Sequence, residues 1–102
     1  MKPTTHIVLG CALALGATLA HAQVPQVKVW AAACANCHGT NGYAQPGMES
    51  LAGKDKADLL QKLMDFNSGR KPATIMHQLS KGYSDEQLQE LAAYFAAQPK
   101  KP

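Results

Sequence analysis

The sequence predicts an all-α domain, and three observations support this fold class. No stretch of the 102-residue chain sustains the alternation of apolar and polar residues that is typical of strands. Several segments instead carry apolar residues three and four positions apart, which is the spacing of one helix face. Glycine and proline separate these segments, and residues typical of helix N-termini precede two of them. We therefore expect about four short helices.

The N-terminal segment has the pattern of an export signal. Lys2 is followed by an apolar run over residues 7–19 and then by an Ala-His-Ala site, which together are typical of a cleaved secretory signal. We expect residues 1–22 to be removed, which leaves one small domain over residues 23–102. The apolar run is too short to span a membrane comfortably. The expected location is the bacterial periplasm.

The charge and the cysteine count narrow the possible functions. The formal net charge is +3, and it falls to +2 once the signal is removed. This excess is too small to indicate binding to nucleic acid or to a membrane surface. Cys11 belongs to the signal, so Cys34 and Cys37 are the two cysteines that remain. A lipoprotein-like cleavage box ending at Cys11 is an alternative, but almost no apolar run precedes it.

The first helix is expected over residues 26–36. Its apolar face consists of residues at helical spacing, namely Val27, Trp30, Ala31 and Cys34. Trp30 lies one turn before Cys34, and we interpret it as a core aromatic. The following residues, 39–53, are expected to be irregular because glycine and proline recur in them, at Gly39, Gly42, Pro46, Gly47 and Gly53.

The second helix is expected over residues 54–67. Asp55 is placed as its N-cap, with Asp58 in the acidic first turn, and Gly69 is placed to end it in a left-handed conformation. Its apolar stripe is formed by Leu59, Leu60, Leu63, Met64 and Phe66.

Two more helices complete the prediction. A short helix is expected over residues 74–79, before Gly82. Ser84 and Gln87 have the spacing of a capping box, which predicts the start of the last helix. The apolar face of the last helix consists of Leu88, Leu91, Ala92 and Phe95.

The segment Cys34-Ala-Asn-Cys37-His38 is the motif on which the functional interpretation depends. Two thiols separated by two residues and followed by a histidine have the spacing of c-type haem attachment. The thiols can add to the two vinyl groups of a porphyrin, and the imidazole can then bind its iron. A thioredoxin-like pair, half of a zinc site and a short disulfide are alternatives. The sequence has no strand pattern that would suit a thioredoxin-like pair and no second pair of ligands that would complete a zinc site. A disulfide between these two cysteines would close a loop too short to constrain the unfolded chain much.

The second axial ligand of the iron is expected to be Met76. A thioether is the usual soft ligand for the remaining position of a haem iron. Met76 lies 38 residues after His38, beyond a full helix that can carry the chain across the porphyrin. Met48 is the alternative, but it lies only 10 residues after His38. Met64 is interpreted as core packing, and His77 is a further alternative ligand that cannot face the iron together with Met76.

The haem motif, the helical pattern and the late methionine resemble the class I cytochromes c over nearly all of residues 23–102. This resemblance implies a small class I cytochrome c fold with one covalent haem. Trp30, Leu91 and Tyr94 resemble the residues at which the N- and C-terminal helices of that family cross.

Three shorter motifs are similar to the cytochrome subunit of flavocytochrome c sulfide dehydrogenase. They are Phe-Asn-Ser-Gly-Arg at residues 66–70, Thr-Ile-Met at 74–76 and Lys-Gly-Tyr-Ser-Asp at 81–85. In that family the methionine of the Thr-Ile-Met run matches Met76. The resemblance implies that the chain accepts electrons from a flavoprotein (FAD) subunit that oxidises sulfide.

The expected activity is electron transfer and not catalysis by the haem itself. If both axial positions are filled, no substrate reaches the iron, and only one-electron exchange remains possible. A free soluble electron shuttle of a respiratory chain is the alternative to a bound subunit. A haem peroxidase would need an open axial site and a distal acid–base group, for which His77 is the one candidate.

Overall fold

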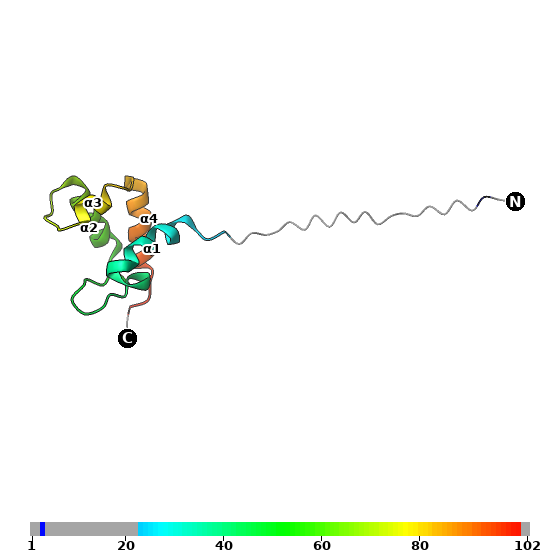
Figure 1. Cartoon of the computed structure of the whole chain (residues 1–102), viewed down its shortest axis with the longest axis horizontal. Helices are drawn as coiled ribbons and strands as arrows, with labels where there is room; N and C mark the ends of the chain where they lie inside the picture. Colours follow the sequence, from blue (N-terminus) through cyan, green and yellow to red (C-terminus); the bar gives the residue numbers. More distant parts are fainter. Residues whose placement is uncertain (1–2, 4–22, 101–102) are drawn as a thin grey trace.

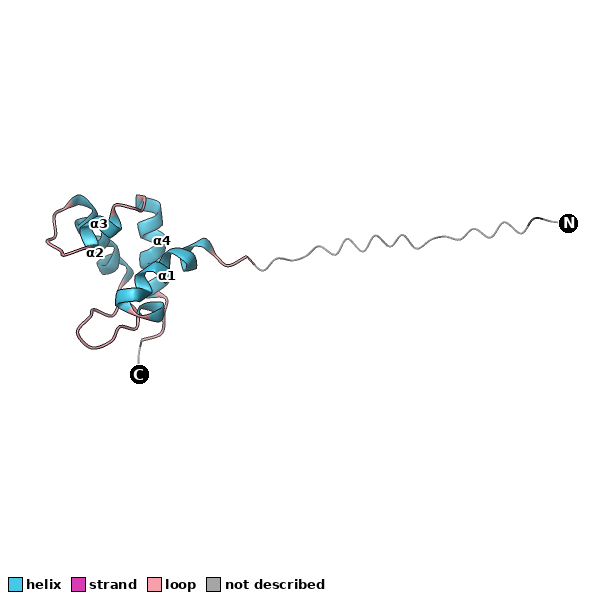
Figure 2. Cartoon of the chain, in the orientation of Figure 1, coloured by secondary structure: helices cyan, strands magenta, loops and turns pink. Residues whose placement is uncertain are grey.

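The computed structural model describes residue 3 and residues 23–100, so the expected signal segment lies outside the described residues apart from Pro3. The described chain is helical, and none of it is in a strand (Figure 2). This confirms the all-α prediction. None of the helices in this part of the chain is both long and apolar enough to cross a membrane. The elements are α1 (Gln26–His38), the 3₁₀ helix η1 (Thr40–Gly42), α2 (Lys56–Ser68), α3 (Met76–Ser80) and α4 (Asp85–Ala96).

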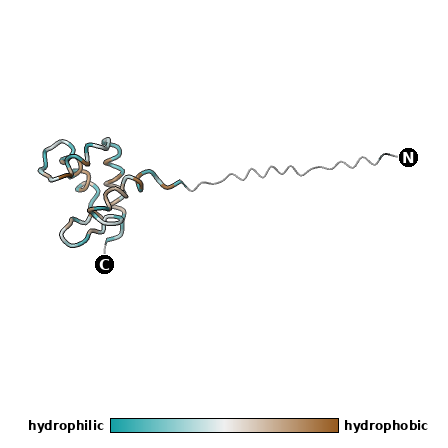
Figure 3. Tube along the Cα trace, viewed as in Figure 1, coloured by the Kyte–Doolittle hydropathy of each residue, from teal (hydrophilic) through white to brown (hydrophobic). Residues whose placement is uncertain are grey.

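Helix α4 forms the centre of the packing. It contacts α1 and α2, and α2 also contacts α3 (Figure 1). The helices carry both polar and apolar residues (Figure 3), and the apolar face expected for the last helix is the one that is buried. Burying one large apolar side chain stabilises the fold by about 1.5–3 kcal/mol. The buried apolar residues are Ala31, Leu59, Leu88, Leu91, Ala92 and Phe95.

Helix α1 is longer than predicted, because it continues through the Cys-x-x-Cys-His motif to His38. It ends at Gly39, whose φ of 78° is in the left-handed region that favours glycine. Trp30 is half-buried against the core, as expected, and its ring meets the edge of Tyr83 at a centroid distance of 6.5 Å. The helix therefore presents both cysteines on its last turns.

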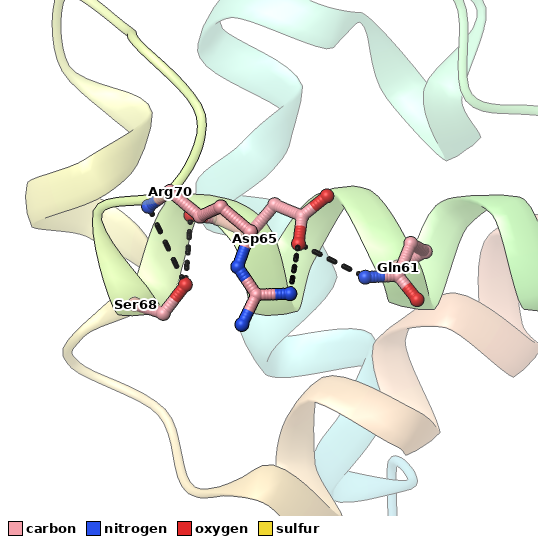
Figure 4. A network of polar contacts seen from close by, with 4 residues as sticks. All are labelled: Gln61, Asp65, Ser68 and Arg70. Atoms are coloured by element: carbon pink, nitrogen blue, oxygen red, sulfur yellow. Dashed lines mark hydrogen bonds and ion pairs between the residues drawn. The ribbon is translucent and has the colours of Figure 1, made fainter.

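The predicted caps of α2 are confirmed. The side chain of Asp55 accepts a hydrogen bond from the backbone N–H of Asp58 at 3.1 Å, and Gly69 has φ 77° and ψ 6°. The helix begins two residues later than expected because Asp55 is its cap. Figure 4 shows the polar contacts near its C-terminal end, where Asp65 accepts from Gln61 at 2.9 Å and pairs with Arg70 at 3.9 Å.

The last two helices differ in how well they were predicted. The capping box of α4 is confirmed, since Gln87 N–H donates to Ser84 Oγ at 3.2 Å and Ser84 N–H to Gln87 Oε1 at 2.8 Å. Helix α3 begins at Met76, two residues later than predicted. Thr74 and Ile75 precede it, and β-branched residues lose side-chain freedom inside a helix.

The segment between α1 and α2 contains the 3₁₀ turn η1, which was not predicted. Its Gly42 is buried, and its carbonyl accepts from the N–H groups of Leu51 and Ala52 at 2.8 and 3.2 Å. These bonds close the loop over residues 43–50. A Cβ on Gly42 would lie 2.9 Å from the Phe95 ring, so this close approach requires glycine.

The C-terminal residues pack against the same loop. The Tyr43 hydroxyl donates to the carbonyl of Pro99, and the Tyr94 hydroxyl donates to Asn41 Oδ1 at 2.5 Å. The N–H of Gly53 donates to the carbonyl of Phe95 at 2.9 Å. The beginning and the end of the loop are therefore both attached to the end of the chain.

Gly39→Ala and Gly47→Ala provide a matched test of the backbone after the haem motif. Both glycines have positive φ, but only at Gly39 would a Cβ overlap another atom, the carbonyl oxygen of Tyr43. We expect Gly47→Ala to lower the free energy of unfolding by about 1–3 kcal/mol, and Gly39→Ala to lower it by more. Urea denaturation of the haem-loaded protein measures both. Equal losses would contradict the overlap at Gly39.

Candidate haem site

A cavity of about 330 Å³ lies among the four helices. Most of its lining is apolar, as is typical of a site for an organic cofactor. Each helix contributes to the lining, and so do the loop after η1 and the segment before α3. Residues that represent these elements are Cys34, Met48, Phe66, Ile75, Met76 and Leu91.

Both cysteines of the motif line this cavity. Cys34 and Cys37 are three residues apart on α1, so their side chains lie on the same side of the helix. Both are free thiols, with Cys34 half-buried and Cys37 exposed. The Cys34 thiol is directed at the carbonyl of Trp30, 3.9 Å away, and burial raises its pKa above the ordinary value. The pair is placed to hold one ligand along one edge.

His38 is oriented by a hydrogen bond within the domain. Its Nδ1 lies 2.7 Å from the backbone carbonyl oxygen of Glu49. A carbonyl oxygen can only accept, so Nδ1 carries the proton and Nε2 keeps a free lone pair. This is how metal-ligating histidines are usually fixed. The acceptor lies in the segment over residues 39–53 that was expected to be irregular.

The structure separates the methionines into two groups. Met76, the first residue of α3, and Met48, in the loop, both line the cavity, whereas Met64 is half-buried and is not part of the lining. Met48 is directly adjacent to Glu49, the residue that accepts from His38. His77 is also outside the lining, and its Nδ1 is buried with no hydrogen-bond partner within the described residues.

Asn67 holds α3 in place, and the sequence reasoning missed this role. Its side-chain amide donates to the backbone carbonyl of Ser80 at 2.9 Å, and Ser80 is 1% exposed. The bond joins the end of α2 to the end of α3, the helix that begins with Met76. The available signal was the position of Asn67 inside the Phe-Asn-Ser-Gly-Arg motif.

An ion pair between Lys62 and Glu49 also borders the cavity and was not predicted. Lys62 Nζ lies 2.5 Å from Glu49 Oε1, and both residues belong to the lining. The hydrogen bond from Lys62 is the main reason that the pKa of the Glu49 carboxyl is lowered. The two residues are 13 positions apart in the sequence, so no local pattern could have indicated the pair.

The surroundings of the cavity fit a porphyrin. Met48, Ile75 and Leu79 are large apolar side chains that remain about half exposed, at 48%, 52% and 48%, and all three line the cavity. An apolar group in the cavity would cover them. Two thiols on one helix turn, an imidazole with a free Nε2 and a methionine from another element form the donor set for such a group. The described residues contain no group of three or more His, Cys, Asp or Glu that could hold a bare metal ion.

A helical domain with this cavity and these donors defines the class as a haem protein of the c type. The family model described as "Cytochrome C oxidase, cbb3-type, subunit III" matches residues 25–95, and the chain belongs to this family of class I c-type cytochromes. Membership implies covalently bound haem c and a role in electron transfer.

The relatives cover the chain to different extents. The cytochrome subunit of sulfide dehydrogenase from Chlorobaculum tepidum is 34% identical over 74 residues, which are 72% of this chain and 67% of that protein. Cytochrome c4 of Pseudomonas aeruginosa is 35% identical over 96 residues, which are 90% of this chain and 48% of that protein. A solved structure of cytochrome c4 from Acidithiobacillus ferrooxidans has 32% identity and a TM-score of 0.61, and it covers 64% of this chain and 38% of that one. The chain thus spans half or less of the cytochromes c4 that it matches here.

Asn67→Ala tests how α3 is held. The substitution removes the side-chain hydrogen bond to the Ser80 carbonyl, which still accepts from the Tyr83 N–H at 3.2 Å, so we expect the free energy of unfolding to fall by about 0.5–1.5 kcal/mol. Ser68→Ala is the matched control, because the Ser68 hydroxyl bonds only exposed backbone groups, and its effect should stay within about 0.5 kcal/mol. Urea denaturation of both variants measures the difference. Similar losses would show that the Asn67 bond does not hold α3.

Proposed function

We propose that this chain is a periplasmic monohaem c-type cytochrome that transfers single electrons. The main observation in support is the cavity at which Cys34, Cys37, His38 and Met76 come together from two helices that are far apart in the sequence. The haem family to which the chain belongs gives these residue types their usual roles. The periplasmic location rests on the expected export signal over residues 1–22.

Each residue of the site has a separate role in this proposal. Cys34 and Cys37 would hold one haem through thioethers, and His38 would bind its iron through Nε2 while its Nδ1–H is held by Glu49. Bound haem supplies a one-electron iron couple, whose potential depends on the axial ligands and on burial. The apolar lining from α2 and α4 excludes water. Cys37 is exposed, so the edge of the haem near the thioethers would be accessible to a redox partner.

Met76 is proposed as the second axial ligand, in preference to Met48. Met48 is bonded through the backbone to Glu49, whose carbonyl lies 2.7 Å from His38 Nδ1. Met48 is therefore on the same loop that supports the histidine, whereas Met76 would reach the iron from a separate element. Met76 is on α3, an element on the other side of the domain from α1 (Figure 1).

Replacement of single methionines tests this ligand assignment. Met76→Ala should remove the weak near-infrared absorption band of sulfur–iron ligation, while the haem stays covalently attached in a denaturing gel. The reduced variant should also bind carbon monoxide rapidly, which the unsubstituted protein should not do. Met64→Ala is the control and should keep the band, because Met64 does not line the cavity. Loss of the band in Met48→Ala instead would make Met48 the ligand.

The proposed electron donor is a flavoprotein (FAD) subunit that oxidises sulfide. This is supported by the similarity to the cytochrome subunit of sulfide dehydrogenase. It is also supported by where the three shared motifs lie, because Phe66, Thr74, Met76 and Tyr83 all line the cavity. The similarity therefore includes the haem surroundings and is not limited to the attachment motif.

Purification of the untagged protein from its own cells tests the partner. A bound subunit should elute together with a yellow polypeptide, so flavin and haem absorbance should rise in the same fractions during gel filtration. The cytochrome c4 relatives make a free carrier the second candidate. Elution of the cytochrome alone, with no flavin in its fractions, would favour this carrier and contradict the bound subunit.

A further inference from the structure

We propose that Lys62 is a positioning residue for His38 and that it acts through its ion pair with Glu49. The pair holds the loop whose backbone carbonyl orients the histidine ring. This inference rests on the proposed ligation of haem by His38.

Glu49 makes both of the interactions on which this proposal depends. Its backbone carbonyl accepts from His38 Nδ1–H at 2.7 Å, and its side chain meets Lys62 Nζ at 2.5 Å. A displacement of Glu49 therefore changes the bond to His38. Because metal-ligating histidines owe their orientation and basicity to this second bond, the position of one loop residue affects the ligand.

The loop has few other attachments to α2. In the described part of the chain, no further hydrogen bond or ion pair joins residues 43–50 to α2. Two bonds within the loop, from Met48 N–H to the Gln45 carbonyl at 3.1 Å and from Ala44 N–H to Ser50 Oγ at 3.0 Å, maintain its shape. They do not fix its distance from the helix. Residues 45–48 are exposed, so packing does not fix this distance for the part of the loop between its two attached ends.

Lys62, in contrast, extends from a firmly held element. Helix α2 is capped at both ends and buries Leu59 in the core. The side chains of Lys62 and Glu49 are 41% and 49% exposed, so the pair is screened by solvent. A pair of this kind changes a local opening equilibrium by about two- to fivefold and is too weak to decide whether the domain folds. Its loss should therefore affect His38 while leaving the fold intact.

Lys54 provides a control that separates the effect of the Lys62–Glu49 contact from the effect of a positive charge near Glu49. Lys54 also lowers the pKa of Glu49 through its charge, but it forms no ion pair with Glu49 in the described residues. Lys54→Met and Lys62→Met thus remove the same charge from the same neighbourhood. Only Lys62→Met removes the contact that holds the loop.

The experiment measures the rate at which the His38 Nδ1 proton of the reduced, haem-loaded protein exchanges with solvent, by proton NMR. Lys62→Met should raise this rate by about two- to fivefold, and Lys54→Met should leave it unchanged. Glu49→Gln should raise it as much as Lys62→Met, and the double variant should raise it no further. Lys62→Arg, which keeps an ion pair, should restore the original rate.

The reduction potential gives a second measurement. A histidine with a weaker Nδ1 bond is a less basic ligand, so the double variant of Lys62→Met and Glu49→Gln, which loses the ion pair at unchanged net charge, should have a higher potential than the unsubstituted protein. Equal exchange rates in Lys62→Met and Lys54→Met would overturn the role of Lys62. A failure of the proposed ligation would be seen separately, because the ring protons of His38 in the unsubstituted protein would then lack the large shifts caused by a haem ring above them.

Discussion

The packing of this domain is arranged around a cavity that its own side chains do not fill. Small domains bury too little apolar surface to be more than marginally stable, and here the fully buried apolar residues are few and come chiefly from α4. Met48, Ile75 and Leu79 remain half exposed around the cavity. A large apolar group inside would extend the core to all four helices. The attachment motif at the end of α1 is therefore a requirement of packing as well as of chemistry.

The elements around the cavity are placed by a small number of polar contacts. Asn67 joins the ends of α2 and α3, and Glu49 accepts from His38 while it pairs with Lys62. The Asn67 bond holds the end of α3, the helix that begins with Met76, and Glu49 holds the His38 ring while it attaches its loop to α2. The orientation of these cavity residues therefore depends on contacts between elements as well as on the helices that carry them.

Much of the fold could be predicted from the sequence, because helix caps are local signals. Asp55, Gly69 and the Ser84–Gln87 box mark helix ends within a few residues of chain, and the structure contains all of them. The start of α3 was predicted two residues too early, because the β-branched Thr74 and Ile75 precede the helix. The 3₁₀ turn at Gly42 was missed, because it depends on contacts of Gly42 with residues further along the chain. For the same reason the contacts of Asn67 and Lys62 could not be predicted. The cavity residues of the Cys-x-x-Cys-His motif could be predicted, because they are adjacent in the sequence.

The attachment of the loop to the end of the chain has a practical consequence. Tyr43 donates to the carbonyl of Pro99, and a Cβ added to Gly53 would lie 2.6 Å from the side chain of Lys100. Trimming by a carboxypeptidase past these residues would remove these contacts with the segment between α1 and α2, which carries Glu49. A variant shortened to before Pro99 therefore lacks one of the attachments of this segment.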